Sequence, residues 1–230
     1  MKIAIYYAMP GELASLVETD TKPMDECAGV RFYRIPTQRH EVIAVAGGVG
    51  KVNAAMAAQL TILKYAPDLI MDVGVAGCFK NVEIGTLMLA QSFIQHDVDT
   101  TAVGDPIGLV STVNRVDFPV DGFDAARKAL DKLGLNYLAG IGATGDWFAT
   151  GTDRAREIEK TFHPLFCEME GGAIAQVCLR NHVHFLAVKS VSDCLFGDGN
   201  YAFNFPKAME NLNQIVLKLI QTLENIEWNA

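Results

Sequence analysis

Short apolar runs and longer amphipathic stretches alternate along this chain. The runs are continuous or nearly so, which is typical of strands buried on both faces of a sheet. The pattern predicts strands at Lys2–Tyr7, Arg31–Ile35, Glu41–Ala46, Leu69–Val73, Leu87–Ile94, Ala139–Ala143, Leu165–Cys167 and His184–Ser190.

Between several of these runs, apolar residues recur at steps of three and four, which is the spacing of one face of a helix. The stretches run from Val49 to Leu63, from Phe123 to Leu133, from Ala155 to Phe162 and from Met209 to Ile226. Thr152 is placed to cap the third stretch, and Pro206 suits an early position in the last helix. We therefore expect four amphipathic helices here.

Strands that alternate with helices predict an α/β fold, in which a mixed sheet is covered by helices on both faces as a three-layer α/β/α sandwich. No internal repeat, low-complexity tract or linker interrupts residues 1–230, so we expect a single domain. In such sheets ligands bind at the carboxyl ends of the strands. The residues that follow the strands are therefore the candidates for function.

The charge balance narrows the class of partner. The 230 residues carry a formal net charge of −8. Nucleic acid and anionic membranes attract a basic surface, so we expect neither as the main partner. No apolar run reaches the roughly 18 residues that span a bilayer, and the first apolar run ends at Pro10 without a signal-peptide cleavage site.

The cysteines and histidines argue against a metal centre. The five cysteines are an odd number without paired ligand spacing, which predicts reduced thiols and a cytoplasmic location. His182 and His184 form an H-x-H pair that would share one face of a strand, beside no other ligand. We expect neither a metal nor a cofactor.

Acidic residues follow three of the predicted strands. Glu12 follows the first, Glu168 and Glu170 follow the seventh, and Asp193 follows the last. Carboxylates serve glycosyl cleavage, in which one group delivers a proton and another handles water. Cleavage of a nucleoside leaves positive charge on the sugar and negative charge on the base, so both kinds of group would assist. Each acid also has a structural interpretation as a helix-start or cap residue, with Glu170 beginning a helix from about Met169 to Arg180.

A glycine-rich segment, residues 47–51, follows a strand and opens a helix. A P-loop needs a glycine where Val45 stands and a Ser or Thr where Val52 stands. A dinucleotide fingerprint needs a third glycine where Asn53 stands. Neither motif is present, so the glycines more simply allow a tight turn or a close approach of the backbone to a ligand.

Six short motifs keep a fixed order and spacing. They are AMPGE at 8–12, GVGKVNAA at 48–55, DVGVAG at 72–77, GDWFATG at 145–151, EMEG at 168–171 and SD at 192–193. With these motifs the chain resembles the bacterial methylthioadenosine/S-adenosylhomocysteine nucleosidases, members of the nucleoside phosphorylase superfamily. The resemblance runs through nearly the whole chain and implies a nucleoside phosphorylase-like fold.

The resemblance implies a role for each acidic residue. Asp193 would be the general acid at purine N7, with Ser192 helping to orient it. Glu12 would hold and activate the attacking water. Glu170 would bind the ribose hydroxyls, with Met169 packing beneath the sugar.

It also implies contacts to the base. Phe148 would stack on the base, the backbone of Ala149 would hydrogen-bond its edge, and Phe203 would close the pocket. Both phenylalanines fall in predicted loops, where an aromatic side chain more often binds a ligand than packs in a core. The remaining predicted substrate contacts are Met9, Val49 and Val75.

The chain departs from the family pattern at three places. Val75 replaces a serine beside the ribose, and Lys189 stands where an arginine is usual. Residues 100–105 lie where family members place aromatic residues that reach the 5′-substituent pocket of a partner subunit. Val103 and Asp105 would make that pocket less aromatic and more polar, which leaves the 5′-group open. The same resemblance implies a homodimer and a place in methionine salvage.

These features favour hydrolysis of a purine nucleoside to free base and a ribose derivative. A phosphorylase of the same fold and a futalosine-type hydrolase are alternatives, and a non-catalytic nucleoside-binding protein is an alternative of another class. Glu12 disfavours phosphate, since like charges ~4 Å apart cost about 4 kcal/mol at an effective dielectric of roughly 20. The presence of Glu12, Glu170 and Asp193 together disfavours a binder.

Overall fold

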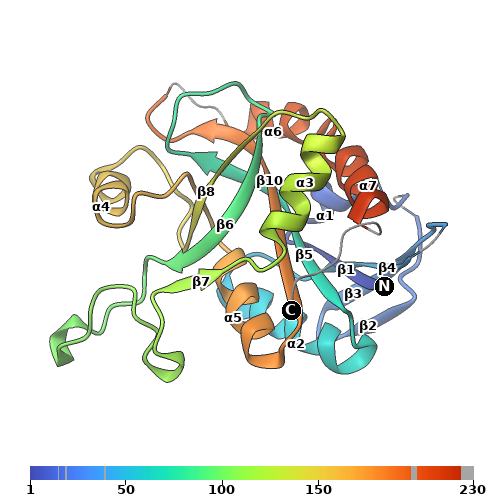
Figure 1. Ribbon diagram of the computed structural model, residues 1–230, viewed down its shortest axis with the longest axis horizontal. Coiled ribbons are helices and arrows are strands. Elements are labelled where there is room, and N and C mark those ends of the chain that lie inside the picture. The colour runs from blue at the N-terminus through green and yellow to red at the C-terminus, as the bar shows by residue number, and fades with distance from the viewer. Residues whose placement is uncertain (15, 19, 39, 198–200, 224–230) are drawn as a thin grey trace.

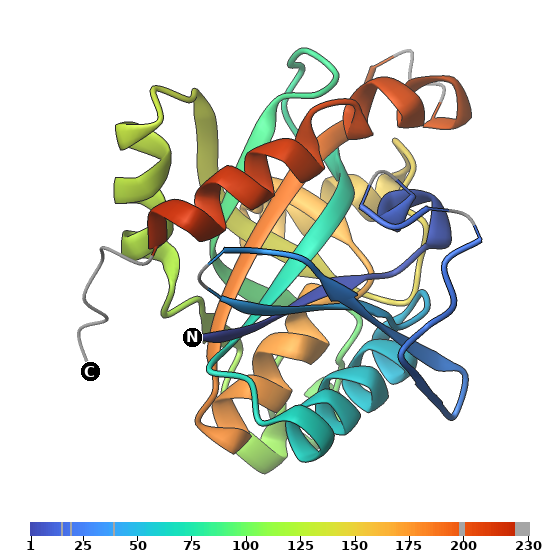
Figure 2. The same ribbon diagram turned by 90° about the vertical axis from the view of Figure 1, so that its right-hand side faces the viewer.

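The computed structural model describes residues 1–223 except 15, 19, 39 and 198–200, and for residues 201–203 it describes the backbone only. A twisted mixed sheet runs through the molecule (Figure 1). Helix α7 (Leu212–Leu223) covers one face of the sheet, and α2 (Lys51–Tyr65) and α5 (Gly171–Asn181) lie against the other (Figure 2). The predicted α/β fold with a mixed sheet is confirmed.

Every predicted strand overlaps an observed one. The strands of the described residues are β1 (Lys2–Tyr7), β2 (Asp25–Cys27), β3 (Val30–Ile35), β4 (Glu41–Ala46), β5 (Leu69–Cys78), β6 (Leu87–Gln95), β7 (Asp117–Pro119), β8 (Tyr137–Thr144), β9 (Phe166–Glu168) and β10 (His184–Cys194). The pattern missed β2 and β7, because each is a three-residue strand that begins with an aspartate and contains no apolar run.

The described residues also form helices between and after these strands. Besides α2, α5 and α7 they are α1 (Pro10–Leu13), α3 (Phe123–Lys132), α4 (Asp153–Phe162) and α6 (Tyr201–Met209), with single 3₁₀ turns η1 (Thr101–Val103) and η2 (Ser111–Val113).

The strand order brings the ends of distant strands together. It runs β10-β6-β8-β9-β5-β1-β4-β3-β2, with β7 beside β6. Strand β10 also pairs with β5, so β5, β10, β6, β8 and β9 form a closed ring of neighbours. Strands β1 and β10 both run parallel to β5. Because the carboxyl ends of parallel strands meet at one edge, residues that follow β1, β5 and β10 lie near one another.

Strands β5 and β10 are longer than predicted. Strand β10 continues past Ser190 to Cys194, so Asp193 lies in the strand rather than after it. A register shift between Val191 and Asp193 interrupts the pairing with β5 at this point. Such irregularities bend a strand and change the direction of its side chains.

The helical stripe of α2 points in an unexpected direction. An apolar stripe usually faces the core, but Val52 and Leu63 are 77% and 74% exposed. The buried side of α2 consists of small residues: Ala54, Ala57, Ala58 and Thr61. Small side chains let the helix lie close to its neighbours. Of the predicted stripe, Met56 and Leu60 are partly buried against the core, and Val52 and Leu63 are left outside.

The predicted C-terminal helix from Met209 to Ile226 is wrong at its start. Two helices occupy this region, and Pro206 lies inside α6 instead of beginning the last helix. The spacing from Met209 to Leu212 continues across the break, so the apolar pattern could not show it. The stripe of α7 is buried, whereas Ile226 lies outside the described residues.

Two smaller expectations also need correction. Thr152 is the N-cap residue of α4, as predicted, but its hydroxyl donates to the carbonyl of Thr150 at 3.3 Å and makes no capping hydrogen bond to the helix. His182 ends α5 with a positive φ of 55°, and His184 begins β10, so the two histidines do not share one face of a strand.

Candidate active site

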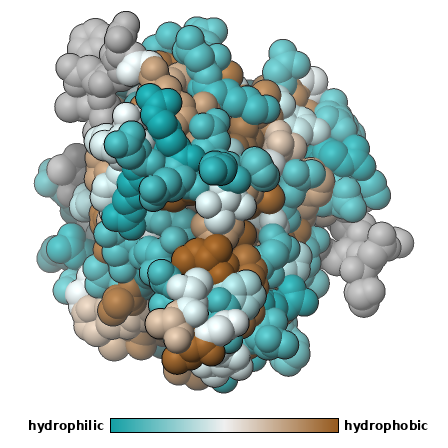
Figure 3. All heavy atoms as spheres, turned by 90° about the vertical axis from the view of Figure 1, so that its left-hand side faces the viewer, coloured by the Kyte–Doolittle hydropathy of each residue, from teal (hydrophilic) through white to brown (hydrophobic). Residues whose placement is uncertain are grey.

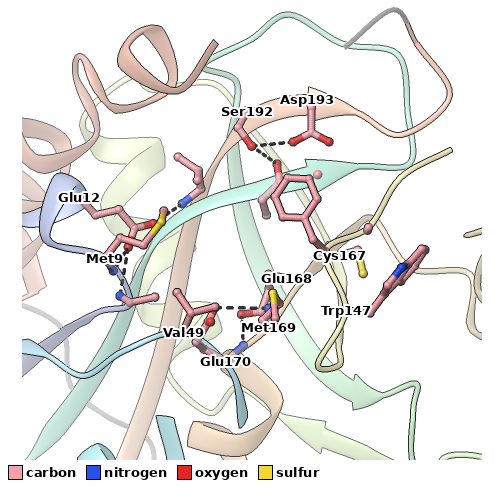
Figure 4. A pocket seen from close by; sticks show the side chains of 16 residues that line it. Met9, Glu12, Val49, Trp147, Cys167, Glu168, Met169, Glu170, Ser192 and Asp193 are labelled. Atoms are coloured by element: carbon pink, nitrogen blue, oxygen red, sulfur yellow. Dashed lines mark hydrogen bonds between the residues drawn. The ribbon is translucent and has the colours of Figure 1, made fainter. Parts of the chain in front are cut away.

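A cavity of about 350 Å³ lies where β1, β5 and β10 end (Figure 4). This volume falls in the usual range of small-molecule sites. The cavity is lined by ten of the eleven predicted site residues: Met9, Glu12, Val49, Val75, Phe148, Ala149, Met169, Glu170, Ser192 and Asp193. The eleventh, Phe203, belongs to α6, and its side chain lies outside the described residues.

Glu12 is held at the start of the short helix α1. The backbone N–H groups of Ala8 and Met9 donate to its Oε2, each at 3.0 Å, and that of Val75 donates to Oε1 at 3.1 Å. The side chain is buried, and this burial raises its pKa, against the opposing effects of Lys189 and of these N–H groups. A carboxylate with three fixed donors keeps one position in the cavity.

The close approach of Glu12 to β5 requires a glycine. A Cβ atom at Gly74 would clash with Oε1 of Glu12. The absence of a side chain at this position therefore lets the carboxylate reach the backbone of the next residue, Val75.

Glu170 is the N-cap residue, immediately before α5. The N–H of Gly50 donates to its Oε1 at 2.8 Å, and Gly50 has a φ of 95°, a conformation that favours glycine. The glycine-rich segment thus binds a protein carboxylate and turns the chain into α2. Burial, together with the nearby charge of Glu168, raises the pKa of Glu170 to about 8.

Asp193 lies across the cavity from Glu12 (Figure 4). Ser192 donates from Oγ to Oδ1 of Asp193 at 2.8 Å, and Oγ also lies 3.3 Å from the carbonyl oxygen of Ala76. Burial raises the pKa of Asp193, and the hydroxyl of Ser192 opposes that rise. An acid with a raised pKa is suited to donate a proton near neutral pH.

The walls of the cavity differ in exposure. Phe148 is 53% exposed and Val49 is 42% exposed, whereas Met9, Val75 and Met169 are half-buried. The lining also includes Glu168 and five residues that were not predicted as site residues: Ala8, Ala76, Gly77, Trp147 and Cys167. In Figure 4, Trp147 lies beyond Cys167 on the far side from Glu12.

A buried charge cluster adjoins the three carboxylates. Lys189 is 2% exposed, and its Nζ lies 2.8 Å from Oδ1 of Asp72 and 3.4 Å from Oε2 of Glu168. Both carboxylates are buried as well, and Glu168 also lines the cavity. The sequence analysis named Glu168 and Lys189 separately, but it did not predict that they meet or that Asp72 joins them.

Among the described residues that line the cavity, none is a lysine, arginine or histidine. Lys189 forms ion pairs with Asp72 and Glu168. The lysine of the glycine-rich segment, Lys51, lies 2.6 Å from Oδ1 of Asp97 and 3.3 Å from Oε1 of Gln95. The cavity therefore presents carboxylates and apolar side chains, and it offers no cationic side chain to a phosphate.

The segment of residues 100–105 contributes nothing to this lining. Oδ2 of Asp105 accepts hydrogen bonds from the hydroxyls of Thr100 and Ser111, at 2.8 and 2.9 Å. Val103 is 80% exposed. The aspartate is thus engaged by its own loop, while the valine projects outward.

Within the described part of the chain, no group of three or more histidine, cysteine or acidic residues is arranged to hold a metal ion. The same residues include no helix with the length and apolar character needed to cross a membrane.

Comparisons with known proteins agree with this fold. The sequence model of the phosphorylase superfamily matches residues 2–221. A 5′-methylthioadenosine/S-adenosylhomocysteine nucleosidase of Shewanella pealeana is 37% identical over 230 residues, which cover 97% of this chain and all of that protein. The chain belongs to the phosphorylase superfamily and, within it, to the family of the 5′-methylthioadenosine/S-adenosylhomocysteine nucleosidases.

Solved structures share the same architecture. The S-adenosylhomocysteine nucleosidase of Streptococcus pyogenes, in complex with 5-methylthiotubericidin, superposes with a TM-score of 0.88 at 30% identity, over 97% of each chain. The futalosine hydrolase of Helicobacter pylori gives a TM-score of 0.85 at 24% identity, over 98% of this chain and 97% of that chain. At that identity the second likeness concerns the fold alone.

Proposed function

We propose that this protein hydrolyses the N-glycosidic bond of a 5′-substituted purine nucleoside such as 5′-methylthioadenosine or S-adenosylhomocysteine. The products are the free base and a ribose derivative. One observation supports this most directly: Glu12, Glu170 and Asp193 line a single cavity, and the described residues of its lining include no lysine, arginine or histidine. The names of the related proteins point to the same substrates.

Asp193 acts as the general acid. When the C1′–N9 bond breaks, the leaving purine gains negative charge, and Asp193 neutralises it by giving a proton to N7. The raised pKa of Asp193 keeps more of the acid protonated near neutral pH. Ser192 holds Oδ1 in place, so that Oδ2 is left for the base.

Glu12 and Glu170 act on the ribose part of the substrate. Glu12 orients a water molecule at C1′ and accepts its proton, and its raised pKa makes it a better base than an exposed glutamate. Glu170 accepts hydrogen bonds from the ribose 2′- and 3′-hydroxyls, which stabilises the sugar as positive charge develops. Met169 packs beneath the sugar, and Met9, Val49 and Val75 surround it.

The base is held by contacts that carry little charge. Phe148 stacks on the purine, and the backbone of Ala149 hydrogen-bonds its edge. Phe203 remains a predicted closing residue. Because Ala149 contributes only backbone groups, the site recognises a purine by its flat shape and by the hydrogen-bonding groups along its edge.

Water is the nucleophile in this proposal. A phosphorylase binds phosphate through cationic donors, and the described lining supplies none. Glu12 would in addition repel an anion that approached C1′ from its side.

A product assay tests the proposal. The protein is incubated with adenosine, methylthioadenosine, adenosylhomocysteine, inosine and futalosine, with and without phosphate, and products are identified by mass. We expect free base and reducing sugar from the adenine nucleosides in phosphate-free buffer. A sugar 1-phosphate would identify a phosphorylase, and futalosine as the preferred substrate would identify a futalosine-type hydrolase. Ligand binding without base release would identify a binder.

We infer that the protein works as a homodimer. Val52, Leu63 and Val103 are large apolar residues more than 70% exposed, and such side chains gather at interfaces when they are contiguous. Figure 3 shows an apolar patch in the lower half of one face, beneath a polar upper half. A second copy of this chain would cover the outward stripe of α2.

Light scattering coupled to size exclusion tests the assembly. We expect twice the 25.0 kDa mass of one chain for the wild type and a shift toward one chain for Val52→Lys. A wild-type mass of one chain at all concentrations would contradict the dimer.

All five cysteines are free thiols, which supports a reducing compartment such as the cytoplasm, where the reaction would serve methionine salvage.

A further inference from the structure

The first turn of α5 is held by a carboxylate that is not among the three proposed above. Oε2 of Glu168 accepts the backbone N–H of Glu170 at 3.0 Å and that of Gly171 at 2.7 Å. Its Oε1 accepts the hydroxyl of Thr144, and that same hydroxyl accepts the N–H of Gly172 at 2.7 Å. Glu168 and Thr144 together thus satisfy three successive N–H groups that a helix start leaves without intrahelical partners.

This carboxylate needs a counter-charge, because it is 6% exposed and lies near other buried acids. Lys189 supplies it: Nζ lies 3.4 Å from Oε2 of Glu168 and 2.8 Å from Oδ1 of Asp72. Lys189 comes from β10, Asp72 from β5 and Glu168 from β9. Three strands therefore meet at one ammonium group.

The cluster connects directly to the sugar end of the cavity. Glu170 is the residue whose own N–H is bound by Glu168, and its carboxylate reaches the N–H of Gly50 at 2.8 Å. The direction of the Glu170 side chain depends on the backbone position from which it starts. That position is fixed by Glu168 on one side and by the body of α5 on the other.

We propose that Glu168, paired with Lys189, is a positioning residue for Glu170: it fixes the first turn of α5 and so directs the Glu170 carboxylate at the ribose hydroxyls. The inference rests on the proposed function, since it assigns Glu170 a substrate contact. Glu168 also lines the cavity, but both of its oxygens are already engaged by protein groups. Its effect on the sugar is therefore transmitted through Glu170.

A double-mutant cycle on kcat/KM tests this directly. Glu168→Gln keeps the size of the side chain but removes its charge, and we expect a loss of about 10²-fold, the scale of a small misplacement of a reacting group. In a Glu170→Gln background the same change should cost no more than about threefold, because residues that act as a unit are not additive. If the losses of kcat/KM in the two single variants multiply in full in the double variant, the proposal is overturned.

A matched control separates this effect from a general loss of charge. Glu83→Gln removes an exposed carboxylate that also pairs with a lysine, Lys207, at 3.3 Å. It should leave kcat/KM within about twofold of wild type, as expected for an exposed ion pair. An effect of Glu83→Gln as large as that of Glu168→Gln would contradict a specific positioning role.

Variants of the lysine provide a second measurement if Glu168→Gln folds poorly. Lys189→Arg retains the charge and should restore most of the activity lost in Lys189→Met. Lys189→Met should also show no additional loss in the Glu170→Gln background. If Arg fails to rescue while thermal unfolding shows a folded protein, the charge pairing is not what positions α5.

Binding to an inert ligand keeps this test separate from the hydrolysis proposal. The probe is a C-nucleoside analogue of adenosine, whose carbon–carbon bond cannot be hydrolysed, together with its 2′,3′-dideoxy form. We expect Glu168→Gln to weaken binding of the hydroxylated analogue by at least about tenfold and to leave the dideoxy form unchanged. Equal weakening of both would overturn the positioning role. Absence of base release by the wild type would instead refute the proposed function alone.

Discussion

The two ends of the cavity are built differently. At the proposed sugar end, Glu12 and Glu170 are 3% and 6% exposed, and five backbone N–H groups donate to them. At the base end, Phe148 is 53% exposed, and Asp193 has one side-chain donor, Ser192. One end is fixed before any ligand binds, whereas the other presents its groups from a strand end and a loop.

The difference corresponds to the chemistry required at each end. Positive charge on the sugar must be met by oriented carboxylates, and orientation fixed in advance avoids reorganisation during the reaction. The base needs one proton and a flat apolar surface. Neither requires side chains that are held as rigidly as those at the sugar end. Mutations at the sugar end should therefore act through position and charge, and those at the base end through a single proton or through contact area.

The largest effect is expected for the proton donor at the base end. Asp193→Asn keeps the shape of the side chain and removes the acid, so kcat should fall by about 10³-fold, within the range of general acid catalysis. Binding of the inert C-nucleoside should change little. Initial rates of base release measure the first quantity and calorimetry the second. Asp121→Asn, at an exposed acid paired with His184, serves as the control and should leave the rate unchanged. A rate loss below tenfold for Asp193→Asn would remove this residue from the chemistry.

The buried charges at the sugar end predict a pH dependence of stability. The pKa of Glu170 is raised to about 8 and that of Asp72 to about 7, mainly by burial. Between their ordinary values and these raised values the folded state holds protons that the unfolded state has lost, so stability falls as pH rises across that interval. The free energy of unfolding should fall by at least about 1 kcal/mol per pH unit between about pH 5 and 7, and should level off above about pH 8.

Urea unfolding across that interval measures this slope. Over the same interval, Glu170→Gln should flatten the slope, because glutamine does not titrate. A flat wild-type profile would show that the acids at the sugar end are not shifted as their burial implies.

The aromatic surface at the base end should matter less than the acids. Phe148→Ala removes the stacking face but no reacting group, so KM should rise by about tenfold with little change in kcat, at the lower end of what base stacking contributes. The steady-state split between KM and kcat checks this. A fall confined to kcat would mean that Phe148 acts on the reacting atoms instead.

The smallest expected change is a gain. Val75→Ser restores a hydroxyl beside the ribose, and one added hydrogen bond should raise kcat/KM about threefold. The comparison of nucleosides with and without ribose hydroxyls shows whether the gain depends on that contact. A gain of equal size on a deoxy substrate would assign it to another cause.

The sequence pointed to three carboxylates that the structure brings to one cavity, because motif order and strand ends are both visible in it. It did not reveal the partners that hold them. Lys189 is one residue in an apolar run, and nothing local shows that Asp72 and Glu168 meet it from two other strands. The direction of α2 was hidden for a related reason, since the alanines of its buried face are too small to dominate an apolar pattern. Strand pairing and helix orientation are tertiary properties.

Gly74 and Val75 are neighbours in the chain, but they differ in how well they should tolerate substitution. Any side chain at position 74 would displace the Glu12 carboxylate, so under the proposed function we expect substitution there to end activity. Val75 lines the cavity with its side chain, while its contact to Glu12 comes from its backbone N–H and is kept when the side chain changes. Under the same proposal, single substitutions at position 75 could change which nucleosides are accepted and leave Glu12 in place.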